Sequence, residues 1–257
     1  MDLFLICLIP LLACWGSFLN FLAYRLVYDV SFAAPRSICP NCHYQIAWFD
    51  LIPIFSWFNL RGICRNCSQP ISKLYPAIEI ATILTGLALV YLCNPADLLA
   101  YFIFVSALLI IIRTDLQTML ISRITTLFLI PVPIILSLAK FNGEPLLPIT
   151  IAQVISGIFL GYLILFLINK IAFLITRTDS IGQGDIDLLA TIGAFTGVYG
   201  VWLSLMIGSI FGSIIGIILI YTGESKLQTK IPFGPFLATG AILYILFQNQ
   251  LLVLLFN

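Results

Sequence analysis

The sequence predicts an all-α polytopic membrane protein with about eight transmembrane helices. Charged residues make up only 9% of the 257 residues, against about 25% in an ordinary soluble domain. Hydrophobic residues make up 61%, and the mean hydropathy is +1.12. This composition excludes a soluble globular enzyme, a disordered chain and a nucleic-acid-binding protein. It places the chain in a lipid bilayer. The net charge of +1 implies no acidic or basic partner.

Charge-free stretches mark the expected helices, since about 20 apolar residues cross a bilayer. The stretch 188–223 holds 36 uncharged residues, which is too long for one span. We expect two short helices there, with a turn near Tyr199 and Gly200. The first helix has Asp2 and no basic residue before it, so it does not resemble a cleavable signal. A count of seven spans is the alternative. The expected spans are 3–24, 80–96, 98–112, 124–139, 145–169, two within 188–223, and 231–257.

The basic residues predict the orientation of these helices. With the N-terminus outside, eleven of the twelve Lys and Arg residues fall in inner loops, and only Lys140 falls outside. Inner loops of membrane proteins carry the excess of basic residues. The inner residues are Arg25, Arg36, Arg61, Arg65, Lys73, Arg113, Arg123, Lys170, Arg177, Lys226 and Lys230.

Residues 26–76 form the only sizeable polar segment, an inner loop between the first and second helices. It carries two C-x-x-C pairs, Cys39/Cys42 and Cys64/Cys67, separated by 21 residues. This spacing is typical of a tetrahedral Cys₄ zinc site, so we expect a small zinc-ribbon-like fold. Disulfides or free thiols are the alternative, although a reducing inner face argues against disulfides.

One further ligand pattern lies in this loop. Cys39-Pro-Asn-Cys42-His43 also matches the C-x-x-C-H pattern of covalent haem attachment. That attachment is expected on the outer face, whereas this loop is predicted to be inner. We therefore interpret His43 as a solvated loop residue.

Two acidic residues at the edges of expected spans are candidate catalytic groups. Asp115 follows the span 98–112, and Asp185 ends the run Gly182-Gln183-Gly184-Asp185 just before the span that starts near 188. The eight-span model puts both at the inner membrane face. Two adjacent carboxylates can share a proton, so that one activates water and the other donates to a peptide carbonyl. This is the arrangement that an aspartyl protease requires.

Each aspartate also has an ordinary structural explanation. Asp115 could be a helix-end carboxylate beside Arg113 and Arg123. Asp185 could cap a helix N-terminus, where a carboxylate is favoured. Asp187 cannot pair with Asp185 within a helix, because positions i and i+2 do not face each other.

Several motifs together resemble the type IV prepilin peptidase family over nearly the whole chain. The four-cysteine segment, Gly182-Gln183-Gly184-Asp185 and Asp115-Leu116 with Ile121 carry most of the resemblance. The other matching residues are Gly16-Ser17-Phe18-Leu19-Asn20, Tyr24-Arg25, Ile46, Pro53, Ser56-Trp57, Arg61-Gly62, Ile71-Ser72, Tyr75-Pro76, Glu79, Leu188-Leu189-Ala190, Gly193-Ala194-Phe195 and Pro232-Phe233-Gly234-Pro235-Phe236.

The resemblance implies a bifunctional enzyme of the bacterial inner membrane that serves type IV pili or type II secretion. Such an enzyme removes the short basic leader of prepilins or pseudopilins after a glycine, on the cytoplasmic side. It then methylates the new N-terminal amine, often of phenylalanine, with S-adenosylmethionine. Asp115 and Asp185 would be the catalytic pair.

The resemblance also divides the chain. Residues 1–25 would be the first transmembrane helix, 26–76 the zinc-binding, methyltransferase-associated loop, and 77–257 a membrane-embedded aspartyl peptidase domain. Cys39, Cys42, Cys64 and Cys67 would be its zinc ligands. The resemblance does not identify the cofactor-binding residues. Glu79 is a candidate, and its alternative interpretation is an acid at a helix N-terminus.

Two positions depart from the family pattern. Ser122 stands where the family usually has proline, and Asp187 stands where it usually has lysine. Because Asp187 replaces a positive charge by a negative one near Asp185, we expect a shifted pH optimum.

Three other functions compete with the peptidase. An ion-coupled transporter could use the same acids, but it would predict inverted repeats, and none is convincing. A presenilin-type intramembrane protease shares G-x-G-D, but its first aspartate usually follows tyrosine, whereas Thr114 precedes Asp115. An assembly factor with a zinc loop would tolerate loss of either aspartate.

Overall fold

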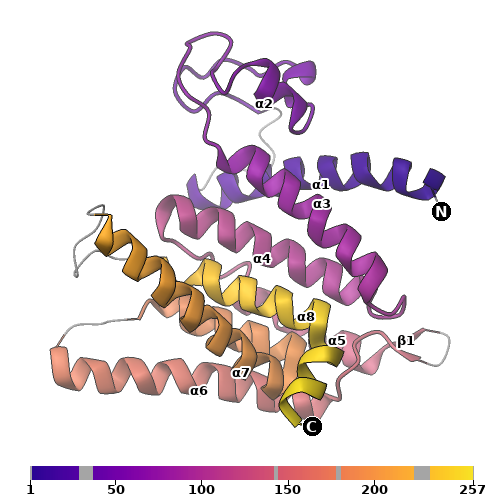
Figure 1. Cartoon of the computed structure of the whole chain (residues 1–257), viewed down its shortest axis with the longest axis vertical. Coiled ribbons are helices and arrows are strands. Elements are labelled where there is room, and N and C mark those ends of the chain that lie inside the picture. The colour runs from indigo at the N-terminus through magenta and orange to yellow at the C-terminus, as the bar shows by residue number, and fades with distance from the viewer. Residues whose placement is uncertain (1, 29–36, 142–143, 178–180, 223–231, 257) are drawn as a thin grey trace. The chain divides into compact units, whose positions relative to one another are not determined.

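The computed structural model describes residues 2–28, 37–141, 144–177, 181–222 and 232–256. Arg36, Lys226 and Lys230, which contribute to the predicted orientation, lie outside these ranges. The elements, labelled in Figure 1, are α1 (Asp2–Tyr28), η1 (Trp48–Leu51), α2 (Phe55–Asn59), α3 (Leu74–Leu92), α4 (Leu98–Thr118), η2 (Leu127–Leu129), α5 (Pro131–Leu138), β1 (Lys140–Phe141), β2 (Glu144–Pro145), α6 (Ile151–Thr176), α7 (Gln183–Tyr221) and α8 (Gly234–Phe256).

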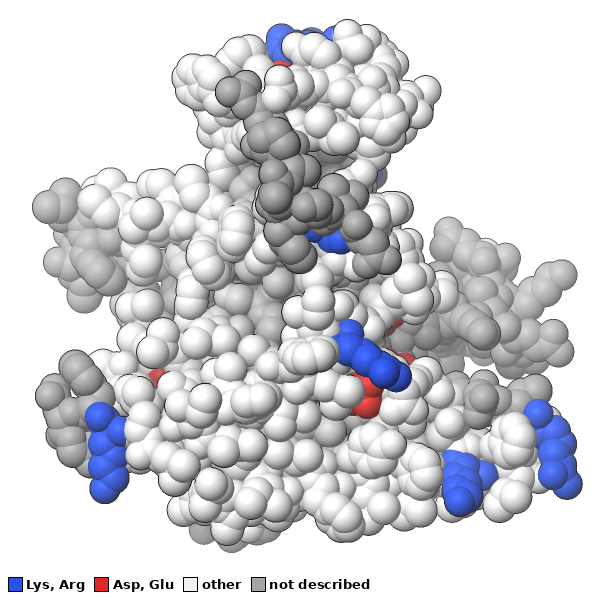
Figure 2. Space-filling view, turned by 180° about the vertical axis from the view of Figure 1, so that it is seen from behind, with Lys and Arg blue, Asp and Glu red and all other residues white. Residues whose placement is uncertain are grey.

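The predicted all-α membrane fold is confirmed, but the count of eight spans is not. Within the described residues, five helices are long and apolar enough to cross a membrane: α1, α3, α4, α6 and α7. The only strands described are the two-residue pair β1 and β2, which run antiparallel. On the face shown in Figure 2, Lys and Arg form isolated patches on a largely uncharged surface.

The expected span 124–139 is the clearest departure from the prediction. It contains the single turn η2 and the eight-residue helix α5. Eight helical residues rise only about 12 Å, which is far short of a bilayer. Pro131 begins α5 and Pro133 follows it within the first turn, and neither residue has an N–H to extend a helix from the preceding chain.

Three helices begin or end at other residues than predicted, because polar residues lie inside these helices or cap them. α6 begins at Ile151 rather than at 145, because Thr150 and Gln153 form a capping box there. α3 begins at Leu74, six residues before the expected start, and includes Glu79. α4 continues past Arg113 and Asp115, both of which are buried.

The chain divides into two compact units, residues 1–88 and 89–257. In the first unit, α1 and α3 approach closely because their contact is lined by small residues. A Cβ on Gly16 would lie 2.8 Å from the Glu79 Cα, and one on Gly86 would lie 2.5 Å from a Leu12 methyl group. Asn20 Nδ2 donates to the Tyr75 carbonyl at 3.0 Å, which adds a polar link between the two helices.

In the second unit, α7 is a helical hairpin rather than one straight rod. Gly197 has φ 67° and ψ −168°, a conformation that only glycine adopts readily. A Cβ on Gly193 would lie 2.8 Å from Val201 Cγ2, so the chain reverses between them. The turn therefore occurs two residues before the predicted Tyr199-Gly200. Residues 183–196 and 198–221 form the two arms, which lie side by side in Figure 1.

Small residues also set the packing of α6 and α8 against α7. A Cβ on Gly157 would lie 2.1 Å from the Gly193 carbonyl oxygen, and one on Gly161 would lie 2.4 Å from that of Leu189. Such backbone contact is typical of membrane helices that associate through glycines four residues apart. Phe104 of α4 stacks on Phe195 with ring centroids 4.2 Å apart, which packs α4 against the first arm of α7.

Candidate active site and candidate metal centre

The four cysteines of the first unit lie together on two similar turns. In the first, Cys39 N–H donates to the Tyr44 carbonyl at 2.9 Å; in the second, Cys64 N–H donates to the Gln69 carbonyl at 2.8 Å. The residue after each second cysteine has a positive φ, 54° at His43 and 57° at Ser68. Each turn thus presents two thiols in the same direction, as predicted from the C-x-x-C spacing.

The geometry of the thiols fits a metal ion. The sulfur atoms of Cys39, Cys42, Cys64 and Cys67 all lie within 4.8 Å of one another. Sulfurs bound to one tetrahedral zinc at about 2.3 Å would be about 3.8 Å apart, and Cys39 Sγ lies 3.9 Å from Cys67 Sγ. The cluster could therefore bind a metal ion with small adjustments.

Asparagine side chains connect the two turns through the sulfurs. Asn41 Nδ2 donates to Cys67 Sγ at 3.7 Å, and Asn66 Nδ2 donates to Cys42 Sγ at 3.6 Å. Such contacts orient and support metal-binding thiolates. A hydrogen bond from the Tyr44 backbone lowers the pKa of the Cys42 thiol to about 6, whereas burial raises that of Cys39 to about 11.

An ion pair braces the same segment. Arg65 binds Asp50 through two parallel hydrogen bonds, Nε to Oδ2 at 2.8 Å and Nη2 to Oδ1 at 2.7 Å. Arg65 lowers the pKa of the Asp50 carboxyl below its ordinary value. The pair connects η1 to the second cysteine turn, because Arg65 lies between Cys64 and Cys67.

Glu79 is buried in the first unit, with 6% of its surface exposed. Its Oε2 accepts the Ile54 N–H at 2.6 Å, and the Ser17 hydroxyl also hydrogen-bonds to it. Ile54 has φ 64°, which is unfavourable for a β-branched residue. The carboxylate therefore stabilises a strained turn of the cysteine segment, and it lies in the second turn of α3.

In the second unit, Asp115 lies in the last turn of α4 with only 4% of its surface exposed. Its Oδ2 accepts the backbone N–H of Gly234 at 3.1 Å. The neighbouring Arg113 donates instead to Gln117 Oε1. Asp115 makes no ion pair within the described parts of the chain, so its position is not explained by pairing with a helix-end arginine.

Asp185 lies in the first turn of α7, where Gly182 is the N-cap residue. Its Oδ1 is buried without a hydrogen-bond partner among the described residues. A buried, unpaired carboxylate oxygen costs free energy. Such a cost is typical of sites where a substrate or water completes the hydrogen bonding. Asp187 instead accepts from Gln183 Nε2 at 3.1 Å, so it is satisfied within its own helix.

Ile121 lies between the two aspartate segments. A Cβ on Gly184 would lie 2.8 Å from Ile121 Cβ, and one on Gly234 would lie 3.0 Å from Ile121 Cδ1 and 2.8 Å from Asp115 Oδ2. The segments that carry the two predicted aspartates thus meet at Ile121, although Asp115 and Asp185 are 70 residues apart in sequence.

Sequence reasoning missed the role of Gly234 in this site. The resemblance noted Pro232 to Phe236 only as the start of the last helix. A glycine between Phe233 and Pro235 gave no signal of a contact with Asp115. The contact depends on how α8 packs against α4, which no local pattern reveals.

Comparison with known proteins supports the same motifs. Residues 11–93 match the model of the bacterial peptidase A24 N-terminal domain, and residues 102–217 match that of the type IV leader peptidase family. The chain is 32% identical over 218 residues to a prepilin leader peptidase/N-methyltransferase of Aeromonas hydrophila, covering 84% of this chain and 73% of that protein.

Other relatives agree. A protein with the same name from Pectobacterium carotovorum is 32% identical over 251 residues, covering 88% of this chain and 87% of the relative. The chain is also 31% identical over 221 residues to a type 4 prepilin-like proteins leader peptide-processing enzyme of Escherichia coli. The match covers 85% of this chain and 78% of that protein. The chain belongs to the type IV leader peptidase family. No solved structure matches it.

Membership of the type IV leader peptidase family bears on the alternatives left open by the sequence. It favours neither an ion-coupled transporter nor a presenilin-type protease. The matched regions include the four cysteines, Asp115 and Asp185.

Proposed function

We propose that this chain is a membrane aspartyl endopeptidase that removes the leader of type IV prepilins or pseudopilins, with Asp115 and Asp185 as its catalytic pair. The proposal includes N-methylation of the new N-terminal residue with S-adenosylmethionine. The observation that carries it is that the two aspartate segments meet at Ile121, where the Gly234 N–H binds Asp115 and one oxygen of Asp185 has no partner among the described residues. The relatives' names supply the substrate and the second reaction.

In this mechanism the two carboxyl groups hold one proton between them. The ionised group accepts a proton from water, and the oxygen of that water attacks the carbonyl carbon of the scissile peptide. The protonated group donates to the carbonyl oxygen. Collapse of the tetrahedral intermediate transfers a proton to the departing amine and leaves a carboxylate at the end of the leader. The Gly234 N–H fixes one oxygen of Asp115, which orients the other toward water.

The predicted orientation places this chemistry at the cytoplasmic face of the bacterial inner membrane. Both aspartates lie in terminal turns of helices, Asp115 at the end of α4 and Asp185 at the start of α7. A basic leader would meet the enzyme there, on the side where prepilins are made.

The methyl-transfer part of the proposal involves the first unit. Cys39, Cys42, Cys64 and Cys67 would hold a structural zinc ion, which would stabilise a segment with little apolar core of its own. S-adenosylmethionine supplies the methyl group when it is bound. Glu79 is the candidate residue for this reaction. It accepts the Ile54 N–H, keeps Ile54 in its strained turn and so ties the cysteine segment to α3.

Co-expression with a prepilin tests the proposal. The intact mass of the pilin should show loss of the leader plus one methyl group with the wild-type chain. With Asp115→Asn or Asp185→Asn, the precursor should remain whole. Cleavage without the methyl group would retain the catalytic pair and remove methylation from the proposal. Several prepilins left uncut by the wild type would contradict the peptidase.

A further inference from the structure

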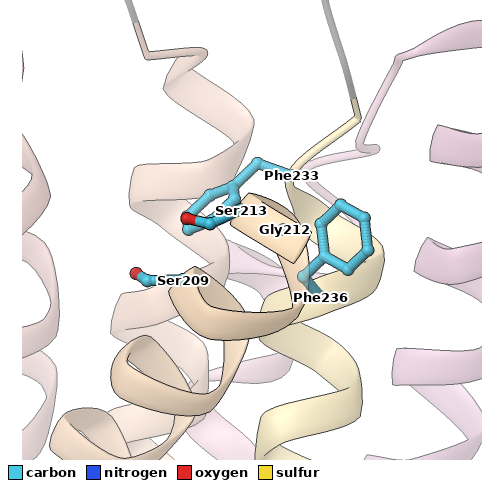
Figure 3. A pocket seen from close by; sticks show the side chains of 5 residues that line it. All are labelled: Ser209, Gly212, Ser213, Phe233 and Phe236. Carbon is cyan, nitrogen blue, oxygen red and sulfur yellow. The ribbon is translucent and has the colours of Figure 1, made fainter. Parts of the chain in front are cut away.

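Asp115 takes its position from the start of α8. The Gly234 N–H binds its Oδ2 at 3.1 Å. Phe236, two residues later, packs on the second arm of α7, where a Cβ on Gly212 would lie 3.3 Å from Phe236 Cδ2 (Figure 3). These contacts explain how Asp115 is held. They leave open what holds Asp185, which lies at the start of the first arm.

The turn that begins α7 keeps the Asp185 carboxylate close to its own backbone. The Gly182 carbonyl accepts the N–H groups of Asp185 at 3.1 Å and of Ile186 at 3.4 Å. A Cβ on Gly182 would lie 3.3 Å from Asp185 Oδ2, so this oxygen lies against Gly182, while Oδ1 has no partner among the described residues. The direction in which Oδ1 points therefore depends on the position of Gly182.

A side chain of α6 fixes the peptide group directly before Gly182. Asn169 Oδ1 accepts the Ile181 N–H at 3.0 Å. Ile181 precedes the N-cap residue of α7, so its N–H has no part in the hydrogen bonding of that helix. The amide oxygen of a neighbouring helix supplies the acceptor that the backbone of α7 cannot.

The packing of α6 against α7 explains why Asn169 reaches this peptide group. Gly157 contacts Gly193, and Gly161 contacts the residue four positions earlier in α7. Every step of four residues forward along α6 thus matches a step of four back along the chain of α7, as expected for antiparallel helices that use one face. Two further steps pair Asn169 with Ile181, the pair that the hydrogen bond joins.

We propose that Asn169 is a positioning residue for peptide cleavage, because its bond to the Ile181 N–H fixes the turn that orients the Asp185 carboxylate. The inference rests on the proposed function. Asn169 acts through Ile181 and Gly182 and not on the reacting atoms. Its loss should therefore slow the chemical step and leave substrate binding unchanged, since a displacement of about 1 Å in a catalytic group can cost about 100-fold in rate.

Steady-state cleavage of one purified prepilin by the wild type, Asn169→Leu and Asn169→Asp tests the inference. Asn169→Leu keeps the approximate size of the side chain but removes the acceptor, so kcat should fall about 10- to 100-fold while KM stays within about threefold of wild type. Asn169→Asp keeps an acceptor oxygen at the same place and should retain kcat within about threefold. Ser156→Leu is the matched control on α6 and should behave as wild type, because the Ser156 hydroxyl donates to the Gln153 carbonyl of the same helix.

The aspartate variant separates positioning from a purely structural role. A residue needed only for folding would change the yield or the thermal stability and leave kcat of the folded enzyme unchanged. Asn169→Ala removes the same acceptor with the best helix-forming residue, so the comparison does not depend on the folding of one variant. Wild-type kcat in folded Asn169→Leu or Asn169→Ala would overturn the inference. An equal loss of kcat in Asn169→Asp, or a rise in KM with kcat unchanged, would also overturn it.

The proposed function fails in a different way. In that case the wild-type chain would leave the prepilin whole, whereas failure of this inference leaves wild-type cleavage intact and changes only the response of the Asn169 variants.

Discussion

Gly234→Ala should disable the peptidase without unfolding the protein. The added Cβ would lie 2.8 Å from Asp115 Oδ2 and 3.0 Å from Ile121 Cδ1. Both are ends of side chains, so the fold can absorb the methyl group by moving them. The Asp115 carboxylate cannot then keep its present place, and its 3.1 Å hydrogen bond from the Gly234 N–H should lengthen or break.

The size of the effect follows from that one bond. A hydrogen bond to a charged group contributes about 1.5–3 kcal/mol, and each 1.36 kcal/mol is tenfold in rate. We therefore expect kcat for leader cleavage to fall about 10- to 100-fold. Methylation of a pilin that has already been cleaved should continue, because the change lies in the second unit.

The kcat for leader cleavage can be measured with purified enzyme in lipid nanodiscs and a purified prepilin. A gel-shift time course follows the loss of the leader. Thr239→Ala on the same helix is the control, since it removes only a hydroxyl bond to the Pro235 carbonyl. Wild-type kcat in a correctly folded Gly234→Ala enzyme would refute the assignment of this glycine to the active site.

Three further outcomes are expected. Cys64→Ser should reduce bound zinc from about one per chain to near zero by elemental analysis; unchanged zinc would exclude this thiol as a ligand. Asp50→Asn should remove the Arg65 pair and cost less than about 1 kcal/mol at pH 7, since the arginine is partly exposed. Because the Asp50 pKa is lowered in the folded state, the stabilisation by the ion pair is present above pH ~4 and lost as pH falls below it. A difference in stability between variant and wild type that stayed constant from pH 7 to pH 3 would contradict this. Glu79→Gln should reduce methylation about tenfold and spare cleavage, since the Ile54 N–H loses a charged acceptor; equal loss of both activities would contradict a role confined to methyl transfer.

Residue patterns predicted the fold class because membrane helices need uninterrupted apolar sequence. They misplaced helix ends where charged residues belong to the helix. Glu79, Arg113 and Asp115 were treated as boundaries, yet each lies within a helix and is buried. A rule that ends each predicted helix at a charged residue fails most where that residue is buried in the protein interior.

The spacing of the two C-x-x-C pairs predicted the four-thiol cluster, because each short turn presents two thiols through its local backbone. The aspartates were found through motif resemblance. Their environment was not, because the contact of Gly234 with Asp115 depends on the packing of α8 against α4. Likewise, the length of the uncharged stretch 188–223 predicted a turn within it, but only the close approach of Gly193 to Val201 shows how tightly the chain reverses.

The central claim is that Asp185 belongs to a catalytic pair, and its neighbour Asp187 offers the sharpest comparison. Both lie in the first turns of α7, but Asp187 is hydrogen-bonded to Gln183, whereas one Asp185 oxygen has no partner among the described residues. Leader cleavage should be measured for Asp185→Asn and Asp187→Asn with purified enzyme and one prepilin. We predict loss of at least about a thousandfold for Asp185→Asn, and retained cleavage with a shifted pH optimum for Asp187→Asn. Substantial cleavage by Asp185→Asn would contradict the catalytic pair.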